Sequence, residues 1–518
     1  MDYSYLWSSL GRSGRFFTEQ FYWIEVPFIL LCALTIFFPR IKSRFIRYAF
    51  PLVPFLVLYL MFDQFYNYLI RMPLPSDFQN IASIFEFEIE MALATIFMFL
   101  LIPMSLLVLI YNASKQLNTN EFYQSVTVRL LLITTAFFVL TSNSFIHYHK
   151  QIFNYSPWSQ EDTIRENGKF SSYIYYANAQ NSNYLRLNQF KNNEKLTDIH
   201  QTLFPHSIKH NKNVHVIALE SFFDPRLLEN IKFSQPILAA ELSQYLNNQQ
   251  DFSLVTSPIY GGGTAQAEFE LLTGVKALAK VNQIEFNVMQ GNATNSFVNH
   301  LKSNNYQTFA TIAASSSFFN SKQAYQSLGF SNVTFMEEQE GFTRRNGEEP
   351  IFDGDLLEYN LQKLTAILKT TNKPIFNYVL GMYGHMPFAR DLIKRPDISV
   401  VEHSDEKVKR ISNQFYYRTK ALAQYIKALI QLDPNSIIFI TGDHLPSILN
   451  KNTQYSLDNK TNISLFIENG KTVDVSGKHF YEMPWFIWDK LSSVAHNRII
   501  PAKKMESLYF TLLSESQL

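Results

Sequence analysis

Two apolar runs in the second half of the chain end on side chains that bind metal ions. The run Ile437–Ile440 is followed, after Thr-Gly, by Asp443 and His444, and the run Val214–Leu219 is followed at once by Glu220. Continuous apolar runs of this length are typical of buried strands. In an open α/β sheet the chemistry collects at the carboxyl ends of the strands. We therefore expect these carboxylates and this imidazole to share one site.

A third apolar run leads to another imidazole. Pro374–Leu380 is followed by Gly-Met-Tyr-Gly and then by His385. If this run is a strand of the same sheet, His385 follows the same edge as the other three side chains. Carboxylates and histidine around a hard divalent ion suit a phosphate substrate.

A glycine-rich segment supplies a hydroxyl of the kind that phosphoryl transfer needs. Residues 260–274 read Tyr-Gly-Gly-Gly-Thr-Ala-Gln-Ala-Glu-Phe-Glu-Leu-Leu-Thr-Gly. The glycines allow a tight turn, and the apolar spacing after Thr264 predicts a helix that ends at Gly274. Free N–H groups and the helix dipole favour an anion at that helix start. Beside a metal ion Thr264 is then a candidate nucleophile; the alternative is that it only caps the helix.

The elements that must position these residues alternate between strand and helix over residues 213–518. The pattern predicts a helix over Asn299–Asn304, a strand over Thr308–Ile312 and a long helix over Ser412–Gln431. The apolar run Met483–Asp489 is predicted to be a late strand. This alternation indicates an α/β domain with a mostly parallel central sheet and helices on both faces.

The composition excludes several classes of protein. A chain of 518 residues is too long for one ordinary domain. Its net charge of +1 gives no indication of a nucleic-acid partner. The single cysteine, Cys32, excludes a disulfide framework within the chain and a cysteine-based zinc site.

The first third of the chain predicts a membrane region. Basic residues between the first two apolar stretches place that loop in the cytoplasm, so that the chain after residue 146 lies outside the cytoplasm. We expect a transmembrane helical bundle over residues 1–146 and a polar linker, partly on the membrane surface, over residues 147–212. The four predicted spans are Phe21–Phe38, Tyr48–Tyr68, Met91–Ile110 and Leu130–Ile146.

The same residues carry a resemblance to a known superfamily. Their order along the chain is Glu220, Thr264, His385, Asp443 and His444. It resembles the alkaline phosphatase/sulfatase superfamily and, more closely, the lipoteichoic acid synthase-like phosphoglycerol transferases. The motifs cover about residues 210–500, and the predicted spans match the family's architecture. The resemblance implies a multi-pass protein of the bacterial plasma (inner) membrane with an extracytoplasmic sulfatase-like catalytic domain.

The resemblance also implies roles for the individual residues. Glu220, Thr264, Asp443 and His444 are expected to bind one divalent ion, Mn²⁺ or Mg²⁺. Thr264 is also the expected nucleophile and carries a covalent phosphoglycerol intermediate. His385 matches the family histidine that contacts the substrate phosphate.

One segment departs from the family pattern. Residues 318–321, Phe-Phe-Asn-Ser, fall where the family has Phe-Trp-Asn-Arg, so Phe319 replaces Trp and Ser321 replaces Arg. Phe319 and Asn320 are expected to contact the substrate, and Lys322 is the candidate for the missing cation. Lysine lacks the bidentate fork of arginine, so the head group or its pose can differ from the family's.

The activity implied by the resemblance is a metal-dependent phosphotransfer. Glycerophosphate would move from phosphatidylglycerol to an extracytoplasmic glycan or glycolipid. One alternative is a phosphoethanolamine transferase of the same superfamily, but those relatives usually carry several disulfides and this chain has only Cys32. The other is a non-catalytic membrane protein that binds glycans, against which the intact nucleophile and ligand positions argue.

Overall fold

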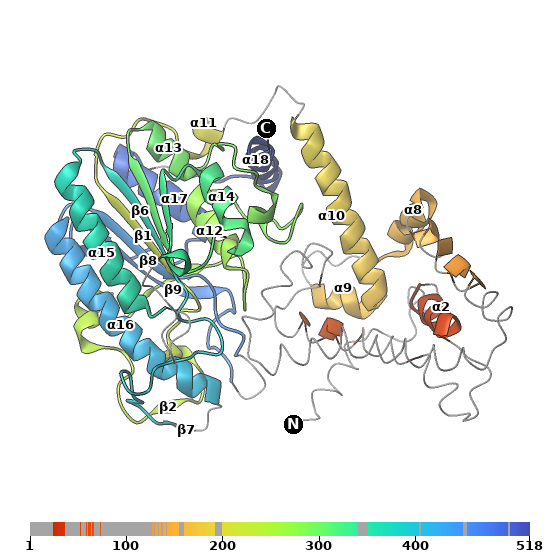
Figure 1. Cartoon of the computed structure of the whole chain (residues 1–518), viewed down its shortest axis with the longest axis horizontal. Coiled ribbons are helices and arrows are strands. Elements are labelled where there is room, and N and C mark those ends of the chain that lie inside the picture. Colours follow the sequence, from red (N-terminus) through yellow and green to blue (C-terminus); the bar gives the residue numbers. More distant parts are fainter. Residues whose placement is uncertain are drawn as a thin grey trace. The chain divides into compact units, whose positions relative to one another are not determined.

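The computed structural model describes the second half of the chain almost without interruption (Figure 1). The chain divides into two compact units, residues 1–182 and residues 183–518. The described residues are 24–36, scattered short stretches between 52 and 140, and then 142–154, 160–191, 199–316, 318–339, 351–402, 406–448, 453–495 and 498–517.

The first unit is described in part. Helix α2 (Val26–Ile36) lies within the first predicted span, and the third, Met91–Ile110, lies wholly outside the described residues. The second and fourth spans are described only in pieces. Among the residues that the structure describes, no helix combines the length and the apolar character needed to cross a bilayer. The transmembrane bundle therefore stays a prediction.

The segment predicted to be a polar linker is largely helical where it is described. Its longest helix, α10, begins at Lys169, whose ammonium group pairs with Asp63 at 2.6 Å. The helices of this segment are α8 (Asn143–Ile152), α9 (Gln160–Asn167), α10 (Lys169–Lys191) and α11 (Ile199–Leu203).

The second unit is built on an eight-stranded mixed sheet in the order β10-β9-β8-β1-β6-β4-β5, with β3 paired to β9. The five strands from β8 to β5 are parallel to one another, whereas β9, β10 and β3 add antiparallel pairs at one side. The strands are β1 (Val214–Leu219), β3 (Ser253–Thr256), β4 (Gln307–Ile312), β5 (Asn332–Phe335), β6 (Ile375–Gly381), β8 (Ile437–Gly442), β9 (Thr461–Glu468) and β10 (Lys471–Val473). The predicted α/β domain is thus confirmed.

Helices cover both faces of the sheet, which explains why β1, β6 and β8 are buried at every residue. Figure 1 shows α15 and α16 side by side along one face, and α12, α13, α14 and α17 on the other. The α-helices of this unit from residue 264 onward are α12 (Thr264–Thr273), α13 (Phe297–Ser303), α14 (Ser321–Leu328), α15 (Asp353–Thr370), α16 (Glu406–Leu432), α17 (Met483–Ser492) and α18 (Ala502–Glu515).

Short elements complete the second unit. A separate two-stranded ribbon pairs β2 (Lys232–Phe233) with β7 (Val401–Glu402). The 3-10 helices are η5 (Pro225–Leu227), η6 (Ala240–Tyr245), η7 (Glu285–Val288), η8 (Phe318–Asn320), η9 (Met336–Glu338) and η10 (Phe480–Glu482).

The predicted strand over Met483–Asp489 is wrong, because this segment opens helix α17. A short apolar run does not distinguish a strand from a buried helix. Pro484 stands in the first helical turn, where its missing N–H costs nothing. The indole N–H groups of Trp485 and Trp488 donate to the carbonyl oxygens of Gly274 and Pro205, both at 2.9 Å. These bonds hold both rings in the interior at helical spacing.

Candidate active site

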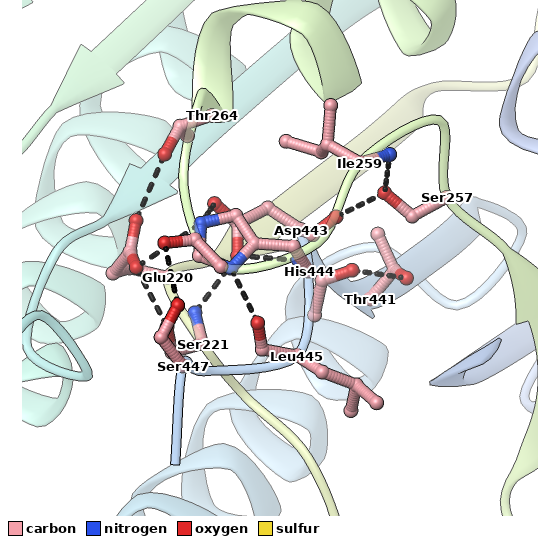
Figure 2. A network of polar contacts seen from close by, with 12 residues as sticks. Glu220, Ser221, Ser257, Ile259, Thr264, Thr441, Asp443, His444, Leu445 and Ser447 are labelled. Atoms are coloured by element: carbon pink, nitrogen blue, oxygen red, sulfur yellow. Dashed lines mark hydrogen bonds and ion pairs between the residues drawn. The ribbon is translucent and has the colours of Figure 1, made fainter. Parts of the chain in front are cut away.

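Three buried side chains form a cluster that can hold a metal ion. Ligand atoms of Glu220, Asp443 and His444 all lie within 4.8 Å of one another. Figure 2 shows the imidazole of His444 between the two carboxylates, and its Nε2 lies 3.4 Å from an oxygen of each. Each side chain is at most 4% exposed. The structure therefore brings these three residues together at one place.

The register of the sheet places these residues together. Leu219, the last residue of β1, pairs with Gly381 of β6 and with Gly442 of β8, so all three strands end level with one another. The ladder continues for one residue, since Glu220 N donates to Gly381 O at 2.8 Å and Asp443 N donates to Leu219 O at 3.1 Å. The side chains released at this edge therefore come from adjacent strands.

Hydrogen bonds to the backbone orient the side chains of Asp443 and His444 and leave one atom of each without a hydrogen bond. Oδ1 of Asp443 accepts from the backbone N–H groups of Ser221 (2.8 Å) and His444 (2.7 Å). Nδ1 of His444 lies 3.0 Å from the carbonyl oxygen of Leu445. With a cation bound, the proton would lie on Nδ1 and the lone pair of Nε2 would face the carboxylates. Asp443 Oδ2 and His444 Nε2 are buried and have no hydrogen-bond partner. Two orphaned ligand atoms beside a second carboxylate fit a divalent cation.

The electrostatics of the cluster also fit a cation. Burial would raise the pKa of Glu220, but the charges of His444 and His385 and hydrogen bonds from Ser221 and Thr264 outweigh burial and lower it to about 2. Burial and the negative charge of Glu220 raise the pKa of Asp443 to about 7. Two carboxylates packed this closely repel each other unless positive charge lies between them.

Thr264 stands where the glycine-rich motif predicted it. It is the first residue of α12, and its Oγ1 donates to Glu220 Oε2 at 2.9 Å (Figure 2). The N-cap position belongs to Gly263, whose φ of 92° requires glycine. The alternative in which Thr264 only caps the helix therefore does not hold. Its hydroxyl is directed to the carboxylate–imidazole cluster and lies at the positive end of a buried helix.

His385 belongs to the same neighbourhood. Its charge is one cause of the lowered pKa of Glu220, and its Nδ1 lies 2.9 Å from the carbonyl oxygen of Met386. The turn before it packs against Glu220: a Cβ on Gly384 would lie 2.0 Å from the Glu220 carbonyl oxygen. Glycine is thus required for the turn that brings His385 to the site.

The segment predicted to contact the substrate forms a kink whose polar side chains bind backbone carbonyl oxygens. Phe319 and Asn320 have positive φ values, 45° and 59°, in a kink that precedes α14. The Asn320 amide donates to the carbonyl oxygens of Phe286 (2.8 Å) and Met289 (2.9 Å), so it braces η7. The hydroxyl of Ser321, which stands at the family's arginine position, donates to the carbonyl oxygen of Phe318.

The candidate replacement cation is on the surface. Lys322 is exposed, and its positive charge is among the causes that lower the pKa of Glu338, after hydrogen bonds from Ser316. The substrate contacts of Phe319, Asn320 and Lys322 stay predictions.

The family relationship follows from a match along the catalytic unit. The Sulfatase family profile matches residues 212–497, more than half of the chain. The chain belongs to the sulfatase family. This match confirms the superfamily predicted from the order of the site residues.

Individual proteins are similar to the chain at low sequence identity. A proposed cyclic beta-1,2-glucan modification protein of Rhizobium meliloti (strain 1021) is 24% identical over 290 residues, which are 55% of this chain and 43% of that protein. The chain therefore spans less than half the length of this curated relative.

Solved structures are also similar to the chain. The lipoteichoic acid synthase LtaP of Listeria monocytogenes is 18% identical, with a TM-score of 0.43 over 61% of this chain and 79% of that chain. The Streptococcus pyogenes phosphoglycerol transferase GacH is 17% identical, with a TM-score of 0.44 over 65% and 92%. The lipooligosaccharide phosphoethanolamine transferase EptA of Neisseria meningitidis is 12% identical, with a TM-score of 0.49 over 95% and 92%.

The structure adds residues to the sulfatase site that the sequence did not single out. The hydroxyl of Ser221 donates to Glu220 Oε1 at 2.7 Å, and that of Ser257 donates to the Asp443 carbonyl oxygen at 2.6 Å (Figure 2). Ser221 directly follows Glu220, a candidate ligand, so its position was a usable signal in the sequence. Ser257 lies far from both Glu220 and Asp443 in the sequence, so no local signal pointed to it.

A buried arginine of α16 binds the backbone of Glu220. Arg418 of α16 is 1% exposed, and its Nε donates to Asp353 Oδ2 at 2.7 Å. Its Nη2 donates to the carbonyl oxygen of Glu220 at 2.8 Å, and its guanidinium lies 4.9 Å from the ring centre of Phe222. The signal in the sequence was a charge on the apolar face of an amphipathic helix, three residues after Phe415.

Proposed function

We propose that this sulfatase-family chain is a membrane-anchored phosphoglycerol transferase. It moves glycerophosphate from phosphatidylglycerol to an extracytoplasmic glycan or glycolipid. The observation that carries the proposal is the hydroxyl of Thr264, which lies at the start of α12 and 2.9 Å from Glu220 in a buried carboxylate–imidazole cluster. A hydroxyl at a helix N-terminus beside ligands for a hard cation suits attack on a phosphodiester.

The proposed metal ligands are Glu220, Asp443 and His444, with Thr264 as the fourth. Mn²⁺ or Mg²⁺ is the proposed ion, since two carboxylates and one imidazole favour a borderline or hard cation. The bound ion would lower the pKa of the Thr264 hydroxyl and offset the charge of the phosphate oxygens. The orphaned Asp443 Oδ2 and His444 Nε2 support this assignment.

The proposed reaction has two displacements at phosphorus. In the first, Thr264 Oγ1 bonds to phosphorus and the bond from phosphorus to the diacylglycerol oxygen breaks; the hydroxyl proton ends on the released diacylglycerol. In the second, a hydroxyl of the acceptor bonds to phosphorus, the Thr264 ester breaks, and Thr264 regains a proton. The free N–H groups of α12 face the phosphate oxygens throughout, and His385 is proposed to contact one of them.

The residues expected around the head group differ from the family pattern. Ser321 stands at the family's arginine position and uses its hydroxyl on a backbone carbonyl. Phe319, Asn320 and Lys322 are proposed to contact the head group, without the bidentate fork of arginine. Phosphoethanolamine transfer therefore remains the second candidate, and non-catalytic glycan binding the third.

The membrane region is proposed to keep the enzyme beside its lipid donor. Residues 1–146 are proposed to form the transmembrane bundle in the bacterial plasma membrane, and residues 147–212 the connection. Residues 213–518 form the proposed extracytoplasmic catalytic domain. A glycan acceptor agrees with the glucan-modification role proposed for the Rhizobium meliloti relative.

Mass spectrometry of the purified full chain tests the proposal. After incubation with phosphatidylglycerol and Mn²⁺, the peptide that contains Thr264 is expected to gain one glycerophosphate. The Thr264→Val variant keeps the shape of the side chain without its oxygen, so it should gain none and release no diacylglycerol. An adduct from phosphatidylethanolamine instead would favour the second candidate. Diacylglycerol release by Thr264→Val at the wild-type rate would contradict the assigned nucleophile.

A further inference from the structure

Exposed apolar side chains in the catalytic unit are concentrated in one segment. Among the described residues from 199 onward, four large apolar side chains are exposed, and three of them lie within nine residues. They are Leu392 (63% exposed), Ile393 (94%) and Val400 (65%); the fourth is Ile499 (85%). Single exposed apolar residues are ordinary on protein surfaces, whereas a concentration indicates an interaction site.

The turn that presents Leu392 and Ile393 is held in place by its own hydrogen bonds. Asp391 Oδ1 accepts from the backbone N–H groups of Ile393 (3.0 Å) and Lys394 (3.2 Å). The Asp391 carbonyl oxygen accepts from Arg395 N at 2.8 Å. Because the carboxylate of Asp391 is used inside the turn, the two aliphatic side chains are directed outward by a defined backbone.

Two buried arginines anchor the turn to the rest of the unit. The guanidinium of Arg395 lies 3.6 Å from the ring centre of Phe352, and Arg395 is 8% exposed. The side chain of Arg390 is 3% exposed and pairs with Asp397. The exposure of the apolar pair is therefore a property of a fixed structure.

The same segment is joined to the turn that carries His385. Nε2 of Gln414 donates to the carbonyl oxygens of Tyr383 (3.3 Å) and Ala389 (2.7 Å). One side chain of α16 thus holds both the turn before His385 and the start of the apolar turn. Figure 1 shows β2 and β7 beside one end of α16, and Val400 bonds to Ser234 next to this ribbon.

The charges around the apolar pair favour an anionic lipid surface. From 390 to 397 the chain carries Arg390, Lys394 and Arg395 against Asp391 and Asp397, which leaves one net positive charge. Lys394 is half exposed and its ammonium group lies 3.5 Å from the carboxylate of Asp391, while the nearby carboxylate of Asp397 is paired with Arg390 and Lys409. Adjacent aliphatic side chains next to lysine are the composition that inserts between the head groups of a bilayer.

We propose that residues 390–396 form a lipid-docking turn, in which Leu392 and Ile393 insert into the head-group layer and Lys394 meets lipid phosphates. The turn would hold the edge of the sheet that carries the site against the bilayer surface. The inference extends the proposed function, because a lipid donor presents its phosphate at that depth. Its primary test needs no turnover.

The test uses the full chain in vesicles of phosphatidylcholine and phosphatidylglycerol. Cys32 is the only cysteine, so a Cys32→Ser background allows one environment-sensitive fluorophore to be attached through Ile393→Cys. Ile499→Cys is the matched control, because it replaces the same residue type at a similar exposure. Spin-labelled lipid is expected to quench the probe at position 393 and not the probe at 499. Three results would overturn the proposal. The probe at 393 could be quenched by aqueous iodide alone, the two probes could be quenched equally by spin-labelled lipid, or a protein contact could protect the probe at 393 from lipid and iodide alike.

A second measurement separates docking from chemistry. The double variant Leu392→Asp, Ile393→Asp is expected to lower turnover of phosphatidylglycerol in vesicles by at least about tenfold, since two aliphatic insertions are lost. Its hydrolysis of a water-soluble chromogenic glycerophosphate ester should be unchanged, which also reports that the variant is folded. Equal loss on both substrates would contradict a docking role. If neither substrate reacts with the wild type, the proposed function fails and the quenching result still decides the docking turn.

Discussion

Replacing Arg418 by methionine should destabilise the catalytic unit and disable its site together. Methionine is unbranched and fills much of the same space. It leaves the Asp353 carboxylate, which is 0% exposed, without the guanidinium that binds it at 2.7 Å. It also leaves the Glu220 carbonyl oxygen without the donor that lies at 2.8 Å. Arg418 is thus a positioning residue for Glu220.

The magnitude follows from the burial of both partners. Removing one partner of a buried ion pair costs about 3–5 kcal/mol, which is a large part of the 5–15 kcal/mol that ordinarily separates folded from unfolded chains. At roughly 2 °C per kcal/mol for a large domain, the unfolding midpoint should fall by about 6–10 °C.

Neutralising the stranded carboxylate should reverse part of this loss. Asp353→Asn keeps an acceptor oxygen without the charge, so the double variant with Arg418→Met should recover roughly half of the lost stability. Full recovery is not expected, since the Glu220 carbonyl oxygen still lacks its donor, at a cost of about 1–3 kcal/mol.

The stranded carboxylate also predicts a pH dependence. Burial already raises the pKa of Asp353, and the charge of Arg418 opposes that rise. In Arg418→Met the opposing cause is gone, so the carboxyl of the folded protein holds its proton to a higher pH than in the unfolded chain. The stability contribution of that proton is present at low pH and lost as pH rises, so the variant should be less impaired at pH 5 than at pH 8.

The assay compares thermal unfolding by tryptophan fluorescence with hydrolysis of a soluble glycerophosphate ester. Arg498→Met is the matched control: Arg498 binds Asp489 through two bonds of 2.9 and 2.7 Å, and none of its described bonds reaches Glu220. It should lower stability and leave activity per folded molecule unchanged, whereas Arg418→Met should lose both. A double variant with Asp353→Asn that is no more stable than Arg418→Met alone would refute the reasoning from a stranded charge.

Three further perturbations have defined outcomes. Thr264→Ser should retain part of the diacylglycerol release that Thr264→Val abolishes, because serine keeps the oxygen; equal loss in both would count against a nucleophilic role. Chelation should lower the unfolding midpoint, and Mn²⁺ at a hundred times its dissociation constant should restore about 2.7 kcal/mol; Asp443→Asn should remove this response and the exposed Asp458→Asn should not. Burial raises the pKa of Glu270 to about 8. The contribution of its protonated form to the free energy of unfolding is therefore lost as pH rises from about 4.5 to 8. Glu270→Gln should reduce the difference in unfolding free energy between pH 5 and pH 8 by at most about 4 kcal/mol. An unchanged difference would show that Glu270 does not titrate with folding.

The strands around the site were predictable because their sequence pattern is local. Val214–Leu219 coincides with β1, and Ile437–Ile440 lies within β8, since strands buried on both faces are continuously apolar. The level ends of parallel strands then bring Glu220 and Asp443 together. The end of α12 was equally predictable, because Gly274 adopts a φ of 74° that favours glycine.

The misassigned segment and the segment expected to contact the substrate are both shaped by tertiary partners. Met483–Asp489 is apolar enough for either structure, and the backbone carbonyls that accept from Trp485 and Trp488 lie more than two hundred residues away. The same is true of Asn320, which was assigned to the substrate by resemblance. Its side chain donates to carbonyl oxygens of η7 and of the residue after it, and no local sequence pattern identifies these partners.

The supporting residues of the site show where sequence reasoning stopped. A candidate metal ligand such as Glu220 can be recognised in the sequence because it directly follows a strand. The residues that hold it in place can be identified only from their contacts in the folded protein. Arg418 reaches the carbonyl oxygen of Glu220 across 198 positions of sequence and is the partner of Asp353 from another helix. Gly384 would carry a Cβ only 2.0 Å from the same carbonyl oxygen, so the turn of His385, the guanidinium and the Glu220 backbone are packed as one unit. A change at any of the three should therefore move the carboxylate of Glu220 and the hydroxyl of Thr264 that it binds, although neither residue has been altered.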